Sequence, residues 1–312
     1  MLVVAVGAGT AVGVVTRPAP TAPPTTPSPL PTVTPEPDTA PFVFQQPLSA
    51  GCATDNAVWV VSDGGGVGRF DGRRWQLIDA TLHSLVAAAC APDALYAVGP
   101  FGRVLSIDDR AKTIRADDIG VFDALAISIV PDGALVVGSQ GNIQRQTSAG
   151  WVQFARGIEE DLFGVASFSG SAWTVGSGGV SYRLETLGWK QYVTGTTSTL
   201  RTVAGSSPTD AVAAGDGGVL LRFDGRWRPL ESHVQGTLRG SVRAGPVTYV
   251  VGDRGVALAV EGDAVRLVDL ATTCTLRSVF ARGAEVWFVG SEGTRAGVWR
   301  QTDGHLDRWG TC

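Results

Sequence analysis

From residue 42 to its end, the chain is a succession of short apolar runs separated by Gly, Pro, Asp and Ser. Residues 200–231 show the pattern best, because the runs LRTVAG, DAVAAG, VLLRFDG and RWRPLE follow one another with turn residues between them. Short apolar or alternating runs with such boundaries are typical of β-strands. No segment after residue 41 carries a convincing helical pattern. The pattern therefore predicts an all-β protein built from units of four strands.

One hairpin, an apolar strand that ends in G-x-x-G, recurs seven times at steps of 37 to 39 residues. The first position of the motif is Ser62 in the first copy and glycine in the other six. The second position is glycine in every copy: Gly65, Gly102, Gly141, Gly179, Gly218, Gly255 and Gly293. We interpret these glycines as structural turn residues. Glycine at both ends of the two-residue turn suits tight hairpins in which positive φ is needed, so we expect both glycines of the motif to supply it. Self-similarity at this period, with four strands per unit, indicates a β-propeller with one blade per repeat.

Seven blades of four antiparallel strands fill residues 42–312. The first strand of the first blade is predicted within 48–55, and the last strand of the seventh within 305–309. Each blade then consists of consecutive strands, and the ring needs no exchange of strands between the two ends of the chain. The stretch FVFQQ at 42–46 is a candidate for an additional edge strand.

Two segments of different composition precede the repeats. Residues 1–16 carry no charge and consist mostly of Val, Ala and Gly. We expect a partial transmembrane anchor here, with a poor signal sequence or a plain apolar tail as alternatives, because a spanning helix needs about 20 residues. Residues 17–41 are rich in Pro and Thr and predict a disordered stalk. Together, the two segments predict a propeller tethered to a membrane outside the cytoplasm, in the periplasm or at the cell surface.

Composition and charge narrow the class of protein further. Of 312 residues, 41 are Gly, 44% are hydrophobic and only 17% are charged, which excludes a highly charged disordered protein. The glycines lack the three-residue period of collagen. A coiled coil is excluded because the chain has only two lysines, Lys112 and Lys190. The net charge of -4 gives no reason to expect a nucleic-acid partner.

The four cysteines occupy matching heights in the predicted blades. Cys52 and Cys90 lie in the first strands of neighbouring blades, whereas Cys274 lies in the connector that enters the last blade and Cys312 follows the last strand. These places permit the disulfides Cys52–Cys90 and Cys274–Cys312, one of three possible connectivities. Four buried free thiols are the alternative. Two disulfides would indicate an oxidising compartment.

Acidic residues gather on one predicted face of the ring. In a four-stranded antiparallel blade, the turn between the second and third strands lies on the same face as the connector between blades. We identify this face as a candidate docking surface for a basic partner or a weak cation site, with ordinary solvated loops as the alternative. Its residues are Asp63, Asp117, Asp118, Glu159, Glu160, Asp161, Asp216, Asp253 and Glu292.

The turns between third and fourth strands carry the motifs FDGRRW at 70–75 and FDGRW at 223–227. After an apolar V-G-x-x-G hairpin, these motifs resemble degenerate Asp-box (BNR-type) repeats, and the repeats are similar to propellers of the photosystem II stability and assembly factor type. The resemblance implies a seven-bladed propeller whose Asp-box residues form turns and pack between blades, and an assembly or scaffold function. The order of anchor, stalk and propeller is also similar to the outer part of bacterial membrane-anchored serine/threonine protein kinases, which implies a sensor. No kinase motif occurs in this chain.

The Asp-box resemblance also implies a less favoured function, a degenerate sialidase-like glycosidase, whose central pocket would need three arginines and a tyrosine–glutamate pair. Arginine does recur in the predicted third strands, away from the channel, at Arg69, Arg145, Arg183 and Arg222. No histidine has metal-ligand spacing. We therefore expect no catalytic residues, metal or cofactor. The expected function is the binding of an unknown protein or small ligand by the connector face or the central pocket.

Overall fold

The computed structural model describes residues 44–312 except 45, 79–83, 111 and 169. The chain divides into two units, Met1–Asp38 and Thr39–Cys312, and the first lies outside the described residues. The anchor expected at 1–16 and the stalk expected at 17–41 therefore remain predictions. Within the described part, the search for a helix of membrane-spanning length and hydropathy finds none.

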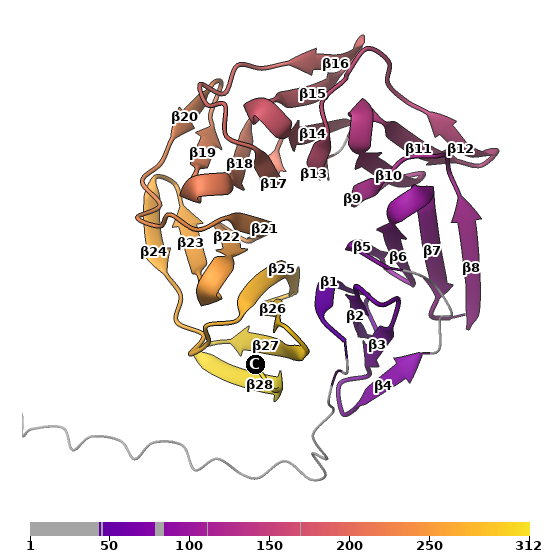
Figure 1. The fold of residues 1–312 in the computed structure, drawn as a ribbon, viewed down its shortest axis with the longest axis vertical. Coiled ribbons are helices and arrows are strands. Elements are labelled where there is room, and N and C mark those ends of the chain that lie inside the picture. Colours follow the sequence, from indigo (N-terminus) through magenta and orange to yellow (C-terminus); the bar gives the residue numbers. More distant parts are fainter. Residues whose placement is uncertain (1–43, 45, 79–83, 111, 169) are drawn as a thin grey trace, which may run out of the picture. The chain divides into compact units, whose positions relative to one another are not determined.

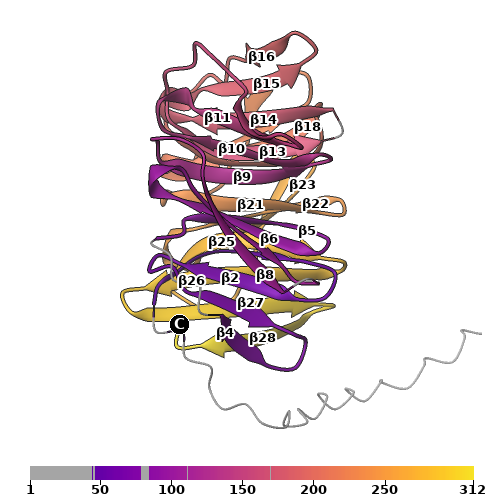
Figure 2. The same cartoon turned by 90° about the vertical axis from the view of Figure 1, so that its right-hand side faces the viewer.

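The second unit is a seven-bladed β-propeller, as predicted, with seven antiparallel sheets of four strands around a central channel (Figure 1). The innermost strands run along the axis of the ring, so their ends lie on its two faces (Figure 2). Every sheet contains four strands that are consecutive in the chain.

The strands of blades 1 to 4 are β1 (Leu48–Ala53), β2 (Val58–Ser62), β3 (Val67–Phe70) and β4 (Trp75–Ile78); β5 (Ala87–Ala91), β6 (Ala94–Gly99), β7 (Arg103–Asp108) and β8 (Thr113–Asp118); β9 (Ala124–Val130), β10 (Gly133–Gly138), β11 (Ile143–Thr147) and β12 (Gly150–Gln153); β13 (Leu162–Phe168), β14 (Ser171–Gly176), β15 (Ser181–Glu185) and β16 (Gly188–Gln191). Those of blades 5 to 7 are β17 (Leu200–Ser207), β18 (Asp210–Gly215), β19 (Leu220–Phe223) and β20 (Trp227–Pro229); β21 (Leu238–Ala244), β22 (Val247–Gly252), β23 (Ala257–Glu261) and β24 (Ala264–Leu267); β25 (Thr275–Arg282), β26 (Glu285–Glu292), β27 (Arg295–Thr302) and β28 (His305–Gly310).

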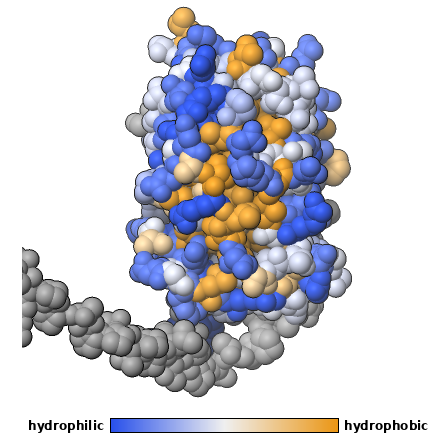
Figure 3. Space-filling model, turned by 90° about the vertical axis from the view of Figure 1, so that its left-hand side faces the viewer, coloured by the Kyte–Doolittle hydropathy of each residue, from blue (hydrophilic) through white to orange (hydrophobic). Residues whose placement is uncertain are grey.

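The core lies between neighbouring blades, where the second strands bury both of their faces. All five residues of β2 are buried, which explains why its sequence is a continuous apolar run. Trp59 of blade 1 packs with Leu95 and Leu105 of blade 2 in one such layer. Apolar side chains also gather on the rim of the ring over β20 and β24 (Figure 3), where Leu267 is exposed.

The Asp-box motifs act in turns and in packing between blades. The Asp71 carboxylate accepts hydrogen bonds from the backbone N–H groups of Arg73 and Arg74, each at 2.9 Å. Trp227, on the outer strand of blade 5, is buried and donates through Nε1 to the Ser181 hydroxyl of blade 4 at 2.9 Å.

The ring closes without strand exchange, as predicted, because β1 lies beside β25 and each keeps its own sheet. Ser291 donates through its hydroxyl to the Leu48 carbonyl across this seam at 3.2 Å. The ring of Phe70 in blade 1 lies 5.8 Å from that of Trp287 in blade 7. Of the stretch 42–46, Phe44 and Gln46 are described, and neither belongs to a strand. The two described residues of this stretch therefore do not form the additional edge strand.

The G-x-x-G motifs form tight turns, but their two glycines do different work. In blades 2 to 6 the turns are the short 3-10 segments η1 (Pro100–Gly102), η2 (Ser139–Gly141), η3 (Ser177–Gly179), η4 (Asp216–Gly218) and η5 (Asp253–Gly255). Gly102 has a φ of +63°, whereas Gly99 is extended with a φ of -158°. Gly99 is needed for another reason, since a Cβ there would lie 2.0 Å from the Ser84 carbonyl oxygen of the incoming connector.

Blade 7 departs from this turn. Its strands β26 and β27 pair as far as Glu292 opposite Arg295, so the turn residues are Gly293 and Thr294. In blades 2 to 6 the turn contains the two residues between the glycines of the motif. Gly290 lies inside β26 rather than at the start of a turn. The prediction that both glycines serve positive φ is therefore wrong for the first position, where close backbone contact is the requirement.

Both predicted disulfides are present. Cys52–Cys90 joins the inner strands of blades 1 and 2, with Cα atoms 5.5 Å apart. Cys274–Cys312 joins the connector entering blade 7 to the end of the chain, with Cα atoms 5.9 Å apart. Disulfides of this kind persist in oxidising compartments.

Candidate functional site at the mouth of the central channel

The inner strands place one side chain per blade at the mouth of the central channel. In six blades the pairing of the inner strand with its neighbour is interrupted near the start of the inner strand, so that one residue is bulged. The bulged residue is the second of the strand in five blades and the third in β25. A β-bulge leaves one residue unpaired and re-aims its side chain. The bulged residues are Ser49, Leu125, Phe163, Arg201, Arg239 and Arg277, and all of them line the channel.

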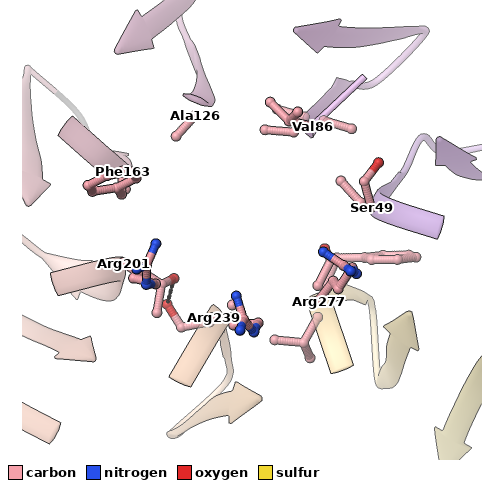
Figure 4. A pocket seen from close by; sticks show the side chains of 18 of the residues that line it. Ser49, Val86, Ala126, Phe163, Arg201, Arg239 and Arg277 are labelled. Atoms are coloured by element: carbon pink, nitrogen blue, oxygen red, sulfur yellow. Dashed lines mark hydrogen bonds between the residues drawn. The ribbon is translucent and has the colours of Figure 1, made fainter. Parts of the chain in front are cut away.

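These residues surround a cavity of about 310 Å³, and their chemistry is divided between its two sides. Arg201, Arg239 and Arg277 come from three successive blades and lie along one side, whereas Val86, Ala126 and Phe163 lie along the other (Figure 4). The mouth of the channel is therefore cationic on one side and apolar on the other.

Two of the three arginines are held by carboxylates of the adjoining turns. Arg201 binds Asp216 through two hydrogen bonds, Nε–Oδ1 at 2.5 Å and Nη2–Oδ2 at 2.9 Å. Arg239 donates from Nε to Asp253 Oδ1 at 2.6 Å. The hydrogen bond from Arg201 and the guanidinium charges hold the pKa of Asp216 below its usual range, although partial burial opposes this. Asp216 therefore stays ionised, and its charge offsets that of Arg201.

The third arginine, Arg277, has a neutral partner. Its Nε donates to the Ser291 hydroxyl at 3.0 Å, and Arg277 makes no ion pair with any residue that the structure describes. Its side chain is exposed, whereas Arg201 and Arg239 are half-buried. Arg201 also stacks on Phe163, with 5.1 Å from Cζ to the ring centroid. Arg277 is thus the arginine of this mouth that is most available to a ligand.

Sequence analysis missed these arginines, although a signal existed. Each follows a leucine at or near the start of an inner strand, and Arg201, Arg239 and Arg277 are spaced by 38 residues. The arginines that it singled out lie elsewhere and are structural, as predicted. Arg69 pairs with Asp109 at 2.9 Å, and the remaining three pair with acidic residues of their own or the next blade: Arg145, Arg183 and Arg222.

The predicted acidic face is divided by the structure. Asp216 and Asp253 pair with Arg201 and Arg239 of the channel mouth, which offset their charges. Glu292 pairs with Arg295. Three acidic residues of the predicted face are therefore neutralised by arginines.

The other acidic residues lie away from the channel lining and mostly support turns. Asp63 accepts from the Ser84 hydroxyl at 2.6 Å, and Asp161 accepts from the Gln140 backbone N–H at 2.9 Å. Glu160 accepts from the Tyr182 hydroxyl. The rest of the predicted face is made of Asp117, Asp118 and Glu159.

Two of these residues lie in a strand rather than in a loop of the predicted face. Asp117 and Asp118 are the last residues of the outer strand β8. Asp118 pairs there with Arg103 at 3.1 Å, and both side chains are exposed. Glu159 is exposed in the connector after blade 3.

The tyrosines of blade 4 bear on the glycosidase alternative. Tyr182 is paired with Glu160, and burial together with this carboxylate raises the pKa of Tyr182 to about 12. Burial and the hydrogen bond to Glu185 likewise raise the pKa of Tyr192. A raised pKa makes a phenol a poorer nucleophile near neutral pH. Neither tyrosine lines the channel with the arginines.

Within the described residues, no three His, Cys, Asp or Glu side chains gather as metal ligands would.

The fold and this mouth define a seven-bladed β-propeller with a cationic channel opening. No protein-family model matches the chain, and no curated protein matches it. Several solved propellers share the fold. YCF48 bound to a D1 peptide aligns with a TM-score of 0.66 at 14% identity, over 87% of this chain and 94% of YCF48.

Two further structures give the same result. YCF48 from Cyanidioschyzon merolae aligns with a TM-score of 0.64 at 15% identity, over 86% of this chain and 97% of that one. U3-55K aligns with a TM-score of 0.68 at 10% identity, over 80% and 90% of the two chains. At these identities the likeness establishes the fold alone, and it agrees with the resemblance to the photosystem-factor type of propeller.

Proposed function

We propose that this chain is a non-enzymatic binding module that holds an anionic segment of a partner protein at the mouth of its central channel. The observation that carries the proposal is the convergence of Arg201, Arg239 and Arg277 on one cavity. Guanidinium groups suit carboxylates because their planar fork donates two parallel hydrogen bonds. The apolar side of the mouth suits the carbon skeleton of the same segment.

The size of the cavity also supports a protein segment as the ligand. A volume of about 310 Å³ is near the lower end of ligand pockets and receives one or two side chains rather than a large cofactor. The D1 peptide bound to YCF48 is an example of a peptide on this fold. An assembly factor and a sensor would bind an anionic segment in the same way, and they would differ in the partner protein to which that segment belongs.

The cellular setting is part of the proposal. We place the propeller outside the cytoplasm, since two disulfides suit an oxidising compartment. Residues 1–16 would tether it to a membrane, and residues 17–41 would hold it at a distance. The acidic residues Asp117 and Glu159 would contribute only to the periphery of the contact.

The test is selection from a random peptide library whose members carry free carboxyl termini. Binding of the enriched peptides is then measured by fluorescence anisotropy for the wild type and for the variant Arg201→Ala/Arg239→Ala/Arg277→Ala. We expect acidic or carboxylate-terminated peptides, an affinity that falls with salt, and at least a tenfold loss in the variant. Glu159→Gln is the control for a charge change at the periphery. Equal affinity of a folded triple variant, or enrichment of basic peptides, would overturn the proposal.

A further inference from the structure

The three arginines occupy the same position in three blades, but the residues that face them differ. Leu200, Leu238 and Leu276 each pair with the first glycine of the blade's G-x-x-G motif, at Gly215, Gly252 and Gly290. The residue after that glycine faces the arginine in all three blades. It is Asp216 in blade 5, Asp253 in blade 6 and Ser291 in blade 7.

The change from aspartate to serine leaves one positive charge without a counterion. Ser291 is buried, and its hydroxyl donates to the Leu48 carbonyl while accepting from Arg277 Nε at 3.0 Å. The single proton of the hydroxyl is therefore engaged by Leu48, and the hydroxyl supplies no charge. Among the residues that the structure describes, none accepts a hydrogen bond from the two terminal nitrogens of Arg277. A ligand carboxylate bound by those nitrogens would complete the pair.

We infer that the channel mouth is a receptor for a single carboxylate, which binds Arg277 in the place that an aspartate takes in blades 5 and 6, and that Ser291 sets this specificity. The inference rests on the proposed function and names the group that the site recognises. A monoanion meets one uncompensated cation here. A doubly charged phosphate would gain the same cation but would also approach the carboxylates of Asp216 and Asp253, which repel it. The apolar side of the mouth favours a carboxylate attached to an apolar group.

The experiment follows the Arg Nε–Hε signals in ¹⁵N–¹H NMR spectra during titration with small probes. The probes are 3-phenylpropanoate, its uncharged amide, and inorganic phosphate. We expect 3-phenylpropanoate to shift the Arg277 signal first and to saturate it at millimolar concentrations. The amide should leave that signal in place, and phosphate should bind no more tightly than the carboxylate.

Two substitutions exchange the blade-specific partners. Ser291→Asp supplies the missing carboxylate, and we expect it to weaken binding of 3-phenylpropanoate at least tenfold, whereas Ser291→Ala weakens it far less. Asp253→Ser frees the second arginine, and we expect phosphate to bind at least tenfold more tightly to this variant. Arg110→Gln, which removes an exposed positive charge paired with Asp93, controls for net charge.

The outcomes separate this inference from the proposed function. If Ser291→Asp does not fold, the Asp253→Ser titration decides. Equal shifts of all three arginine signals, tighter binding of phosphate by the wild type, or no gain in Asp253→Ser would overturn the single-carboxylate receptor. Peptide binding that is lost in the triple arginine variant would still support the proposed function in that case. Peptide binding that ignores the arginines, beside a carboxylate response at Arg277, would overturn the proposed function alone.

Discussion

At the scale of single residues, the turns between second and third strands show where side chains are tolerated at a cost. The middle of the turn has positive φ in blades 2 to 6, and blades 4 and 5 place Gly178 and Gly217 there. Blades 2, 3 and 6 instead carry Phe101, Gln140 and Arg254 at φ values of 55° to 59°. A left-handed conformation costs a residue with a Cβ about 1–2 kcal/mol.

The first prediction concerns Phe101, whose side chain is 73% exposed and so contributes little packing. We expect Phe101→Gly to leave the free energy of unfolding unchanged or to raise it by up to about 1 kcal/mol, because the relief of strain outweighs the entropy that glycine adds to the unfolded chain. Urea unfolding followed by tryptophan fluorescence measures the effect. Gly102→Ala is the matched opposite, since its Cβ would lie 2.2 Å from the Gly120 carbonyl oxygen. It should cost about 1–3 kcal/mol, and a cost for Phe101→Gly of that size would contradict the argument.

Residues also explain why the candidate site escaped sequence analysis. Repeat spacing predicts strands and blades, because a glycine that recurs at a fixed step marks the position of a turn in each blade. The direction of Arg201, Arg239 and Arg277 depends on a bulge, which adds one residue to a strand and turns a side chain that alternation alone would place elsewhere. The acidic residues were easier to see, but their countercharges are far away in the sequence. Arg201 lies 15 residues from Asp216.

At the scale of elements, neighbouring blades are joined by pairs that span one repeat. Arg69 on β3 of blade 1 binds Asp109, which follows β7 of blade 2, through hydrogen bonds of 3.0 and 2.9 Å. Asp109 is buried, and Lys112 adds a third contact at 2.7 Å. Burial by itself raises the pKa of Asp109, but the hydrogen bonds from Arg69 and Lys112 outweigh it and hold the pKa below its usual value.

The second prediction is the pH dependence of this junction. Because the pKa is lowered on folding, the stabilisation is fully present above the unfolded-state pKa, near pH 4, and is lost as pH falls through the folded-state value. Asp109→Asn should therefore lower the free energy of unfolding by about 1.5–3 kcal/mol at pH 7, and the difference from wild type should shrink below pH 4. Urea unfolding between pH 3 and 7 measures it. Asp93→Asn, at an exposed pair with Arg110, should cost less than about 1 kcal/mol. A difference that stays constant with pH would contradict the assignment.

At the scale of the whole molecule, the ring has one junction that the chain does not cross, between blades 7 and 1. Aromatic side chains close it, because the rings of Phe70 and Trp75 in blade 1 lie 5.4 and 6.4 Å from that of Trp309 in blade 7. The chain end takes the place that connectors occupy elsewhere, since the backbone N–H of Thr311 donates to the Ala296 carbonyl at 2.8 Å. The Cys274–Cys312 disulfide fastens residue 312 to the connector that enters blade 7.

The third prediction separates the two disulfides by what their removal exposes. Each spans 38 residues, so each should contribute roughly 2–4 kcal/mol to the free energy of unfolding. Cys274→Ser/Cys312→Ser should in addition speed amide hydrogen exchange in β28, because the chain end is then free to separate from blade 7. Hydrogen exchange read by mass spectrometry measures the local effect. Cys52→Ser/Cys90→Ser is the control and should leave β28 protected. The same increase of exchange in both variants would show that the last strand is held by other means.

The absence of strand exchange at the seam has a consequence for the order of the chain itself. Each blade is one uninterrupted stretch of sequence, so the backbone passes between neighbouring blades only through a connector, and the Cys52–Cys90 disulfide adds a second covalent link between blades 1 and 2. A circular permutant that joins the present ends by a linker and begins at any connector would keep every sheet whole. The mouth of the channel would survive such a cut, because its arginines sit on three complete blades. The propeller is thus a cycle in which the starting blade is arbitrary.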